Sequence, residues 1–268
     1  MSILDDILAT KRDEVTVLRR PQTRDLLRAQ ALDAPPTRDF MGALRRADGH
    51  LAVIAECKRR SPSKGDLAPD LDPAATARAY AAGGAAAMSV LTDREYFGGA
   101  VADLQAAREA VEIPILRKDF TIDEVQIYEA RAIGADAILL ILAALPEDAH
   151  LLDLHDLARS LGLGVLVEAH DAAEVARGVS LGVEVLGVNA RDLATFGEDL
   201  GAAAASSAAI PGTTIAVAES AIRGVDDAGA MAAVGFDAVL VGEALVRSPD
   251  PTALVAAMTA MTVRRRGG

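Results

Sequence analysis

The stretch IGADAILLIL, residues 133–142, decides the fold, because a glycine that can end a helix is followed within two residues by an apolar run. The same entry recurs as GGAAAMSVL from Gly83, LGVEVLGVN from Leu181 and VGFDAVLVG from Val234. Each copy is typical of a helix that ends and leads into a buried strand. Strands that alternate with helices in this way indicate a parallel sheet with helical crossovers.

Working outward from these four stretches, we find short apolar runs that alternate with alanine-rich segments containing charges at helical spacing. The predicted strands are residues 51–56, 86–91, 113–117, 136–142, 163–168, 184–189, 214–218 and 237–241. Eight parallel strands are the number that closes a (β/α)8, or TIM, barrel. We therefore expect an α/β protein with one TIM-barrel domain over residues 1–268.

The segments that flank the barrel have different patterns. Residues 1–48 are expected to form an N-terminal helical extension, residues 49–262 the barrel, and residues 263–268 a disordered tail. Within the extension, residues 2–19 have the spacing of an amphipathic helix with Ser2 as N-cap, and Pro21 is expected to end it. The segment 35–50 predicts a connector and one more short helix.

The composition narrows the function classes. The chain has 268 residues, a hydrophobic share of 51% and a net charge of −12, which argues against nucleic acid or a membrane surface as partner. A single cysteine, Cys57, excludes an internal disulfide and a cysteine-rich zinc site. The first residues lack the pattern of a signal peptide, and the longest apolar run, 137–145, is too short to span a bilayer. We expect a cytoplasmic protein.

Charged residues end the odd-numbered strands of the predicted barrel, at Glu56, Lys118, Glu168 and Glu219. Alternate strands of such a barrel share layers of side chains, so these groups should meet at one mouth. Because side chains alternate along a strand, Lys58 should point inward with Glu56, and Cys57 outward toward the helices.

Seven motifs resemble those of the indole-3-glycerol phosphate synthase family, in order and at matching spacing over nearly the whole chain. They are IAECKRRSPSKG, SVLTDREYFGG, PILRKDF, LVEAH, GVNARDL, VAESAI and VLVGEAL. The resemblance implies ring closure of 1-(2-carboxyphenylamino)-1-deoxyribulose 5-phosphate, with loss of carbon dioxide and water. It also implies a small-molecule phosphosugar–anthranilate substrate, no metal, no organic cofactor and a monomer.

The resemblance assigns roles to the ionic residues. Lys118 matches the general acid that protonates the ketone oxygen, with a pKa that burial and nearby cations are expected to lower. Lys58 matches the lysine that positions the substrate carboxylate, and Glu56 is expected to hold Lys58 or Lys118 in place. Glu168 matches the carboxylate used in the dehydration, with the partner lysine left open.

The remaining matches surround this group. Asn189 is expected beside the reacting region and Arg191 against the substrate carboxylate, where its planar fork suits bidentate binding. Three further polar positions, Ser220, Glu219 and Ser61, match site residues of the strand ends and the first loop. The expected apolar walls are Phe97, Phe120 and Leu139.

The phosphate is expected after the last two strands, at Ala221, Gly242 and Glu243. Ala221 stands where the family usually has glycine, so its Cβ and any positive φ would weaken phosphate binding. The Glu243 side chain is expected to point away. Of the four histidines, His170 lies nearest the mouth, and it is interpreted as a supporting or solvated residue.

Two other functions remain open at this point. One is another phosphosugar barrel, such as a phosphoribosylanthranilate isomerase, although the outward-facing Cys57 does not fit the cysteine which that family uses. The other is a barrel that binds a phosphate ligand without catalysis, which Ala221 favours.

Overall fold

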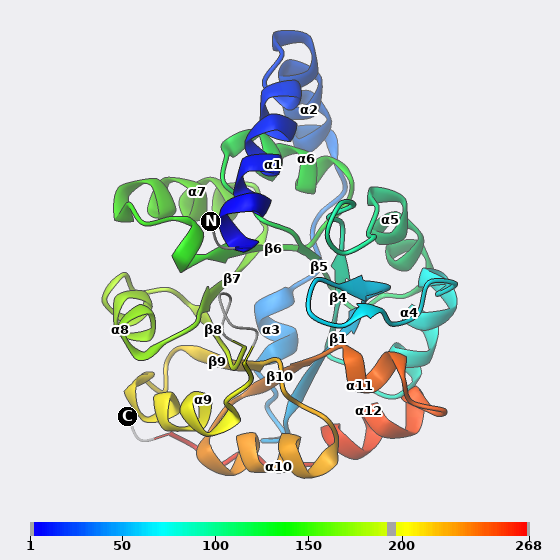
Figure 1. Ribbon diagram of the computed structural model, residues 1–268, viewed down its shortest axis with the longest axis vertical. Helices are drawn as coiled ribbons and strands as arrows, with labels where there is room; N and C mark the ends of the chain where they lie inside the picture. Colours follow the sequence, from blue (N-terminus) through cyan, green and yellow to red (C-terminus); the bar gives the residue numbers. More distant parts are fainter. Residues whose placement is uncertain (1–2, 192–196, 267–268) are drawn as a thin grey trace.

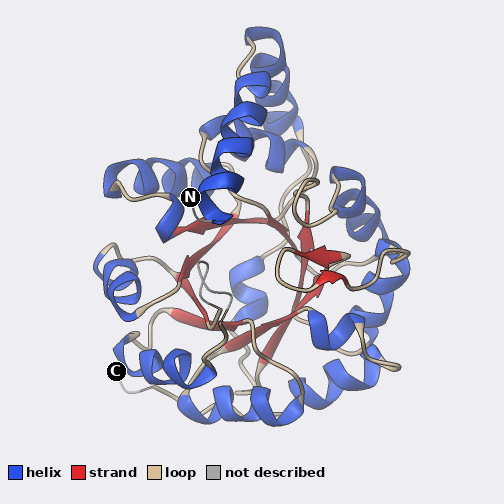
Figure 2. Ribbon diagram, in the orientation of Figure 1, coloured by secondary structure: helices blue, strands red, loops and turns tan. Residues whose placement is uncertain are grey.

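A computed structural model describes residues 3–191 and 197–266, and its centre is a closed ring of eight parallel strands (Figure 2). The strands are β1 Ala52–Cys57, β4 Ala87–Leu91, β5 Ile115–Lys118, β6 Ala137–Ile141, β7 Gly164–Ala169, β8 Val185–Asn189, β9 Ile215–Glu219 and β10 Ala238–Val241. Each strand pairs with its neighbours in sequence, and β1 closes the ring by pairing with both β4 and β10. The predicted TIM barrel is confirmed.

Helices surround the ring, as the alanine-rich segments predicted (Figure 1). They are α4 Pro73–Ala82, α5 Val101–Ala110, α6 Glu124–Ala132, α7 Asp148–Ser160, α8 Ala172–Ser180, α9 Leu200–Ser206, α10 Val225–Val234, the short α11 Glu243–Val246 and α12 Pro251–Thr259. Two 3-10 turns, η1 Leu142–Ala144 and η2 Ser207–Ala209, follow β6 and α9. The aspartates Asp72, Asp123 and Asp171 cap α4, α6 and α8 by accepting backbone N–H bonds.

The N-terminal extension contains three helices, α1 Ile3–Leu18, α2 Pro21–Asp33 and α3 Phe40–Leu44. The expectation for Pro21 is corrected in part: α1 ends before it, but Pro21 also begins α2, because proline is well tolerated at the first helical position. The predicted cap Ser2 lies outside the described residues. Figure 1 shows α1 and α2 extending beyond the ring while α3 lies beneath its centre.

The barrel strands have one face in the lumen and one against the helices. Ala52 and Ile54 of β1 pack in the lumen with Phe40 and Leu44 of α3, which close that end of the barrel. Cys57 belongs to the layer between strands and helices, as its parity predicted. The lumen below the mouth is therefore filled with apolar side chains, and the charged strand ends lie above them.

A two-stranded hairpin and the chain end complete the structure. The hairpin, β2 Arg60–Ser61 and β3 Gly65–Asp66, follows β1 at the mouth. Residues 263–266, which we expected in a disordered tail, bind the barrel: the Val263 N–H donates to the Gly49 carbonyl, and Arg266 pairs with Asp237 at 2.7 Å. Within residues 3–191 and 197–266, no helix has the length and apolar character needed to cross a membrane.

Candidate active site

A cavity of about 480 Å³ opens at the carboxyl ends of the barrel strands. All of the predicted site residues line it: Glu56, Lys58, Ser61, Phe97, Lys118, Phe120, Leu139, Glu168, Asn189, Arg191, Glu219, Ser220, Ala221, Gly242 and Glu243. Residues that are far apart in the sequence therefore meet at one mouth, as the pattern of strand ends predicted.

Lys118 lies at the centre of the charged group. Its Nζ is 3.1 Å from Glu168 Oε2 and 3.6 Å from Glu219 Oε2, and both carboxyl groups are almost completely buried. Lys118 and Glu219 end β5 and β9, and Glu168 is the last residue but one of β7; these are the third, seventh and fifth strands of the barrel in sequence. This arrangement leaves one amine opposite two acids at the bottom of the cavity.

The pKa of Lys118 differs from the expectation. Burial by itself would lower this pKa, but the carboxylates of Glu168, Glu219 and Glu56 outweigh burial and raise it above its ordinary value. The expected lowering is therefore wrong for the free site, because the nearest charges are anions rather than cations. Lys118 is a cation at neutral pH and has a proton to donate.

The two acids beside Lys118 titrate in opposite directions. Burial opposes ionisation of Glu168, yet Lys118 and His170 lower its pKa well below the ordinary range. Burial and the neighbouring Glu168 carboxylate raise the pKa of Glu219 well above that range. The site thus pairs an acid that ionises more readily than usual with one that holds its proton to higher pH than usual, an arrangement suited to separate acid and base roles.

Lys58 and Glu56 form a second ion pair, with Nζ 2.7 Å from Oε1. Burial opposes ionisation of Glu56, but Lys58 and Lys118 lower its pKa. Gly242 makes room for this pair, since a Cβ at that position would lie 2.6 Å from Glu56 Oε1. The charge of Lys58 is partly compensated, which suits a residue that positions an anion without binding it tightly.

Asn189 and Arg191 extend the polar network from β8. The Asn189 side chain donates to Glu168 Oε1 at 3.1 Å and accepts the backbone N–H of Arg191 at 3.0 Å. The Arg191 guanidinium donates to Ser63 Oγ at 2.7 Å and forms an ion pair with Glu198. Its fork is therefore occupied here, and a substrate carboxylate would have to replace one of these partners.

The apolar wall combines barrel loops with the N-terminal extension. The rings of Phe97 and Phe120 are 6.2 Å apart between centroids and stand beside Leu139. Ile3 and Ile7 of α1 also line the cavity. The sequence did not indicate this, although Ile7 is one of the apolar residues at helical spacing within residues 2–19.

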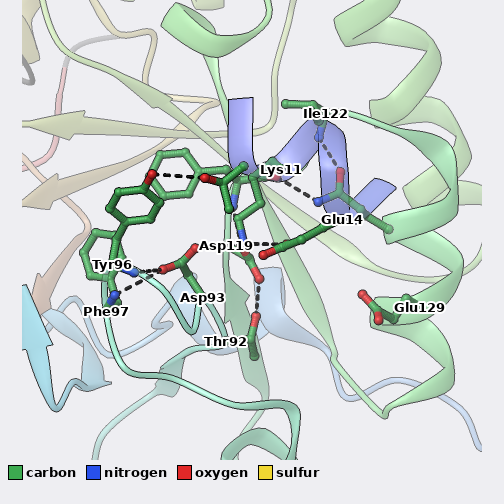
Figure 3. Close-up of polar contacts among 12 residues, drawn as sticks. Lys11, Glu14, Thr92, Asp93, Tyr96, Phe97, Asp119, Ile122 and Glu129 are labelled. Atoms are coloured by element: carbon green, nitrogen blue, oxygen red, sulfur yellow. Dashed lines mark hydrogen bonds and ion pairs between the residues drawn. The ribbon is translucent and has the colours of Figure 1, made fainter. Parts of the chain in front are cut away.

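A buried lysine fixes α1 against this wall. Lys11 Nζ lies 2.8 Å from Asp93 Oδ2 and 3.0 Å from Asp119 Oδ1 (Figure 3). Asp93 also accepts the backbone N–H groups of Tyr96 and Phe97. The helix is thereby joined to the loops that contain Phe97 and Phe120.

The opposite end of the cavity has the features of an anion site. Ser220 and Ala221 have φ values of 65° and 57°, so the positive φ that would be costly for alanine is present. No side chain caps the N-terminus of α11 at Gly242. Glu243 lines the cavity and pairs with Arg247 at 3.1 Å, so the expectation that its side chain points away from a phosphate stays a prediction.

Several polar residues of the cavity were not predicted. Four of them could contact an anion: Lys64, Arg223, Arg247 and Ser248. His170, expected to be a supporting or solvated residue, has its Nε2 3.0 Å from Glu168 Oε1. Its spacing of two residues from Glu168 in LVEAH is the signal that could have indicated this contact.

Comparisons with known proteins agree with this geometry. The family model described as "Indole-3-glycerol phosphate synthase" matches residues 4–258. A protein of that name from an Arthrobacter species is 50% identical over 263 residues, covering 97% of this chain and 96% of its own. Another from a Nocardioides species is 51% identical over 259 residues, covering 97% of this chain and 98% of its own.

Among solved structures, a thiamine phosphate pyrophosphorylase from Pyrococcus furiosus has a TM-score of 0.58 at 16% identity, covering 80% of this chain and 96% of that one. At this identity the similarity concerns the fold alone. The full-length matches in sequence, together with the ionic groups at the barrel mouth, place the chain in a defined family: it belongs to the indole-3-glycerol phosphate synthase family.

Proposed function

We propose that the protein is a decarboxylating lyase that converts 1-(2-carboxyphenylamino)-1-deoxyribulose 5-phosphate to indole-3-glycerol phosphate, carbon dioxide and water, a step of tryptophan biosynthesis. The observation that carries the proposal is the contact of the Lys118 ammonium with Glu168 and Glu219 inside one cavity. Family membership supports the same reaction. The roles given to single residues below are parts of this proposal.

The first step joins the aryl ring to the ketone carbon. As the ring carbon attacks, the carbonyl oxygen gains charge, and Lys118 transfers its proton there to give a hydroxyl group. The raised pKa of Lys118 keeps the proton in place until the developing alkoxide, a much stronger base, accepts it. Carbon dioxide then leaves, and its bonding electrons restore the aromatic ring.

The second step removes water. Glu168 accepts the anilino proton while the hydroxyl group departs as water, with a proton from Lys58 or from Lys118 once solvent has returned the proton that Lys118 gave up in the first step. A proton shift from ring carbon to nitrogen then completes the indole. Glu168 suits this role because its lowered pKa keeps it ionised, and Asn189 donates to its Oε1.

Substrate binding is assigned to the two ends of the cavity. Phe97, Phe120 and Leu139 would contact the aromatic ring, and Lys58 with Arg191 would direct the carboxylate. The backbone after Ser220, together with the N-terminus of α11, would bind the phosphate. Ser61 belongs to the hairpin above the mouth and would contact the substrate from that side.

The direct test is to add the carboxyphenylamino substrate to the purified protein and follow indole fluorescence. We expect product to form, and Lys118→Met to lower kcat by about 10²- to 10⁴-fold, the usual contribution of a general acid. A folded variant with wild-type turnover would contradict the role of Lys118.

The same assay decides between the alternatives. Substrate binding by the wild type without product would favour a non-catalytic phosphate-binding barrel. Failure to bind as well would indicate a different phosphosugar substrate.

We further propose that the enzyme acts in the cytoplasm as a monomer without a nucleic-acid partner. The net charge of −12 supports the last point. Sedimentation equilibrium of the purified protein tests the monomer, and a dimeric mass at micromolar concentration would overturn it.

A further inference from the structure

His170 lies directly after β7, two residues beyond Glu168, and its side chain is only 10% exposed. Its Nε2 lies 3.0 Å from Glu168 Oε1, and its Nδ1 lies 3.2 Å from Glu174 Oε2 in α8. The backbone N–H of His170 also donates to Glu174 Oε2 at 2.8 Å. The imidazole therefore lies between two carboxylates, one in the cavity and one outside it.

The Glu168 carboxyl group has contacts besides its hydrogen bond with Glu219. Lys118 approaches Oε2, while Asn189 donates to Oε1 from β8 and His170 approaches the same oxygen. Removing the His170 contact would leave Oε1 with Asn189 alone and would allow the carboxylate to turn toward Lys118. The orientation of the proposed base thus depends on a residue that does not line the cavity.

We propose that His170 is a positioning residue: its imidazolium, fixed by Glu174, orients the carboxylate of Glu168 and keeps it ionised for the dehydration. The inference rests on the proposed function, because it assumes that Glu168 accepts the anilino proton. His170 itself touches no substrate atom in this arrangement. It acts only through Glu168.

The surrounding charges support a cationic imidazole. Burial would lower the pKa of His170, but Glu168 and Glu174 outweigh it and raise the pKa to about 10. Glu168 in turn faces Lys118 from β5, Glu219 from β9 and Glu56 from β1. Burial opposes ionisation of Glu168, while Lys118, His170 and a hydrogen bond with Glu219 favour it, so the positive charge of His170 supports the ionised form of Glu168.

The test compares His170→Gln and Glu174→Gln with the wild type. We expect His170→Gln to lower kcat by roughly 10- to 100-fold, a loss typical of a misplaced catalytic group, with little change in KM. The acidic limb of the kcat–pH profile should move to higher pH, because Glu168 loses a neighbouring cation. Glu174→Gln should shift the acidic limb in the same direction but by a smaller amount than His170→Gln, because Glu174 acts on Glu168 only through His170.

The matched control is His150→Gln, since His150 is exposed and, among residues 3–191 and 197–266, the polar contact of its ring is with the Ile122 carbonyl at 3.0 Å. This variant should keep the wild-type profile. A His170→Gln enzyme with unchanged kcat and an unchanged acidic limb would overturn the inference, as would a folded variant that lost the same fraction of kcat at every pH with no shift of the acidic limb.

A second measurement separates this inference from the proposed function. NMR titration of the histidine side chains in the whole protein should show His170 protonated well above pH 7, with its pKa lowered by Glu168→Gln. If the wild type does not convert the substrate, the proposed function fails independently of this result. If His170 titrates near its ordinary value of 6.5, the inference fails even when turnover is normal.

Discussion

Ala221 has a left-handed backbone, with a φ of 57°, directly after β9. This conformation costs an alanine about 1–2 kcal/mol, while glycine pays about 0.4–1 kcal/mol of extra unfolded-state entropy. Ala221→Gly should therefore raise the free energy of unfolding by about 0.5–1 kcal/mol, the difference between these two costs. It should also lower KM, since removing the Cβ lets a phosphate approach the backbone. Urea denaturation and steady-state kinetics measure the two effects.

Ala244 offers a matched control, because it lines the same cavity from within the helix α11. Ala244→Gly should destabilise the protein by about 0.5–1 kcal/mol, as glycine does in helix interiors. If both variants lost stability equally, strain at Ala221 would not be the cause.

At the scale of single residues, the sequence predicted which side chains meet but not how they titrate. Lys118 and Glu168 could be placed at the mouth because both end predicted strands, and parity then fixed their direction. The direction in which the pKa of Lys118 shifts could not be predicted. It depends on how close the Lys118 amine lies to Glu219 and Glu56, which belong to other strands. Those distances follow from the closure and register of the barrel.

Among the strands, β8 has a glycine where it faces the charged cluster. A Cβ on Gly187 would lie 2.0 Å from Glu219 Oε1 and 3.2 Å from Leu166 Cδ1. Gly187→Ala should displace the flexible end of the Glu219 side chain and so lower kcat/KM at least tenfold. The variant should lose less than about 3 kcal/mol in free energy of unfolding, the usual upper range for overpacking. Kinetics and thermal denaturation of the variant check this.

Gly229→Ala, in α10, is the corresponding control. Its new Cβ would meet only ordinary contacts, the nearest being Met261 Sδ at 3.5 Å. We expect unchanged kinetics and a stability gain of up to about 1 kcal/mol from helix propensity. Wild-type kinetics for Gly187→Ala would mean that the position of Glu219 is not critical.

The helix α1 depends on Lys11 for its position at the mouth. Lys11→Met would remove the cation that Asp93 and Asp119 share and leave Asp119 with Arg117 as its cation, and breaking a buried pair in this way typically costs about 3–5 kcal/mol (Figure 3). We expect α1 to separate from the barrel while the strands remain folded, and KM to rise because Ile7 leaves the apolar wall. Limited proteolysis should detect faster cleavage within α1.

Arg12→Met is the control for this substitution, since Arg12 is the next residue of α1 and is exposed. Its cleavage rate and KM should match the wild type. An unchanged cleavage rate for Lys11→Met would show that apolar contacts alone fix the helix.

Some helices and strands are easier to predict from the sequence than others. All eight barrel strands were predicted because each is an apolar run after a helix-ending glycine or a charged loop. The helix α2 was missed because its apolar periodicity is weak and only Ala31 in it is buried. The hairpin β2–β3 was read as a loop, since two-residue strands leave no periodic pattern.

For the whole molecule, stability should depend on pH through the buried carboxylates. Glu56, Asp119 and Glu168 have pKa values below their ordinary 4.5 or 3.8 in the folded state, because the neighbouring lysine and arginine cations outweigh burial. Such groups contribute stability that is complete above the ordinary pKa and is lost as pH falls through the folded-state pKa. The free energy of unfolding should therefore decrease steeply below about pH 4.5.

Glu219 should behave in the opposite way, since its folded-state pKa is raised above 4.5. Its contribution to stability is complete below 4.5 and is lost as pH rises through the raised folded-state pKa, because Glu219 ionises at lower pH in the unfolded chain than in the folded protein. Glu219→Gln removes the titration while keeping the shape. Its stability relative to the wild type should increase between pH 5 and pH 8 in urea denaturation.

The control Glu112→Gln, at a side chain that is 99% exposed, should parallel the wild type. If Glu219→Gln also ran parallel, Glu219 would be ionised at neutral pH, and the division of the two acids into a base and a proton-bearing partner would not hold.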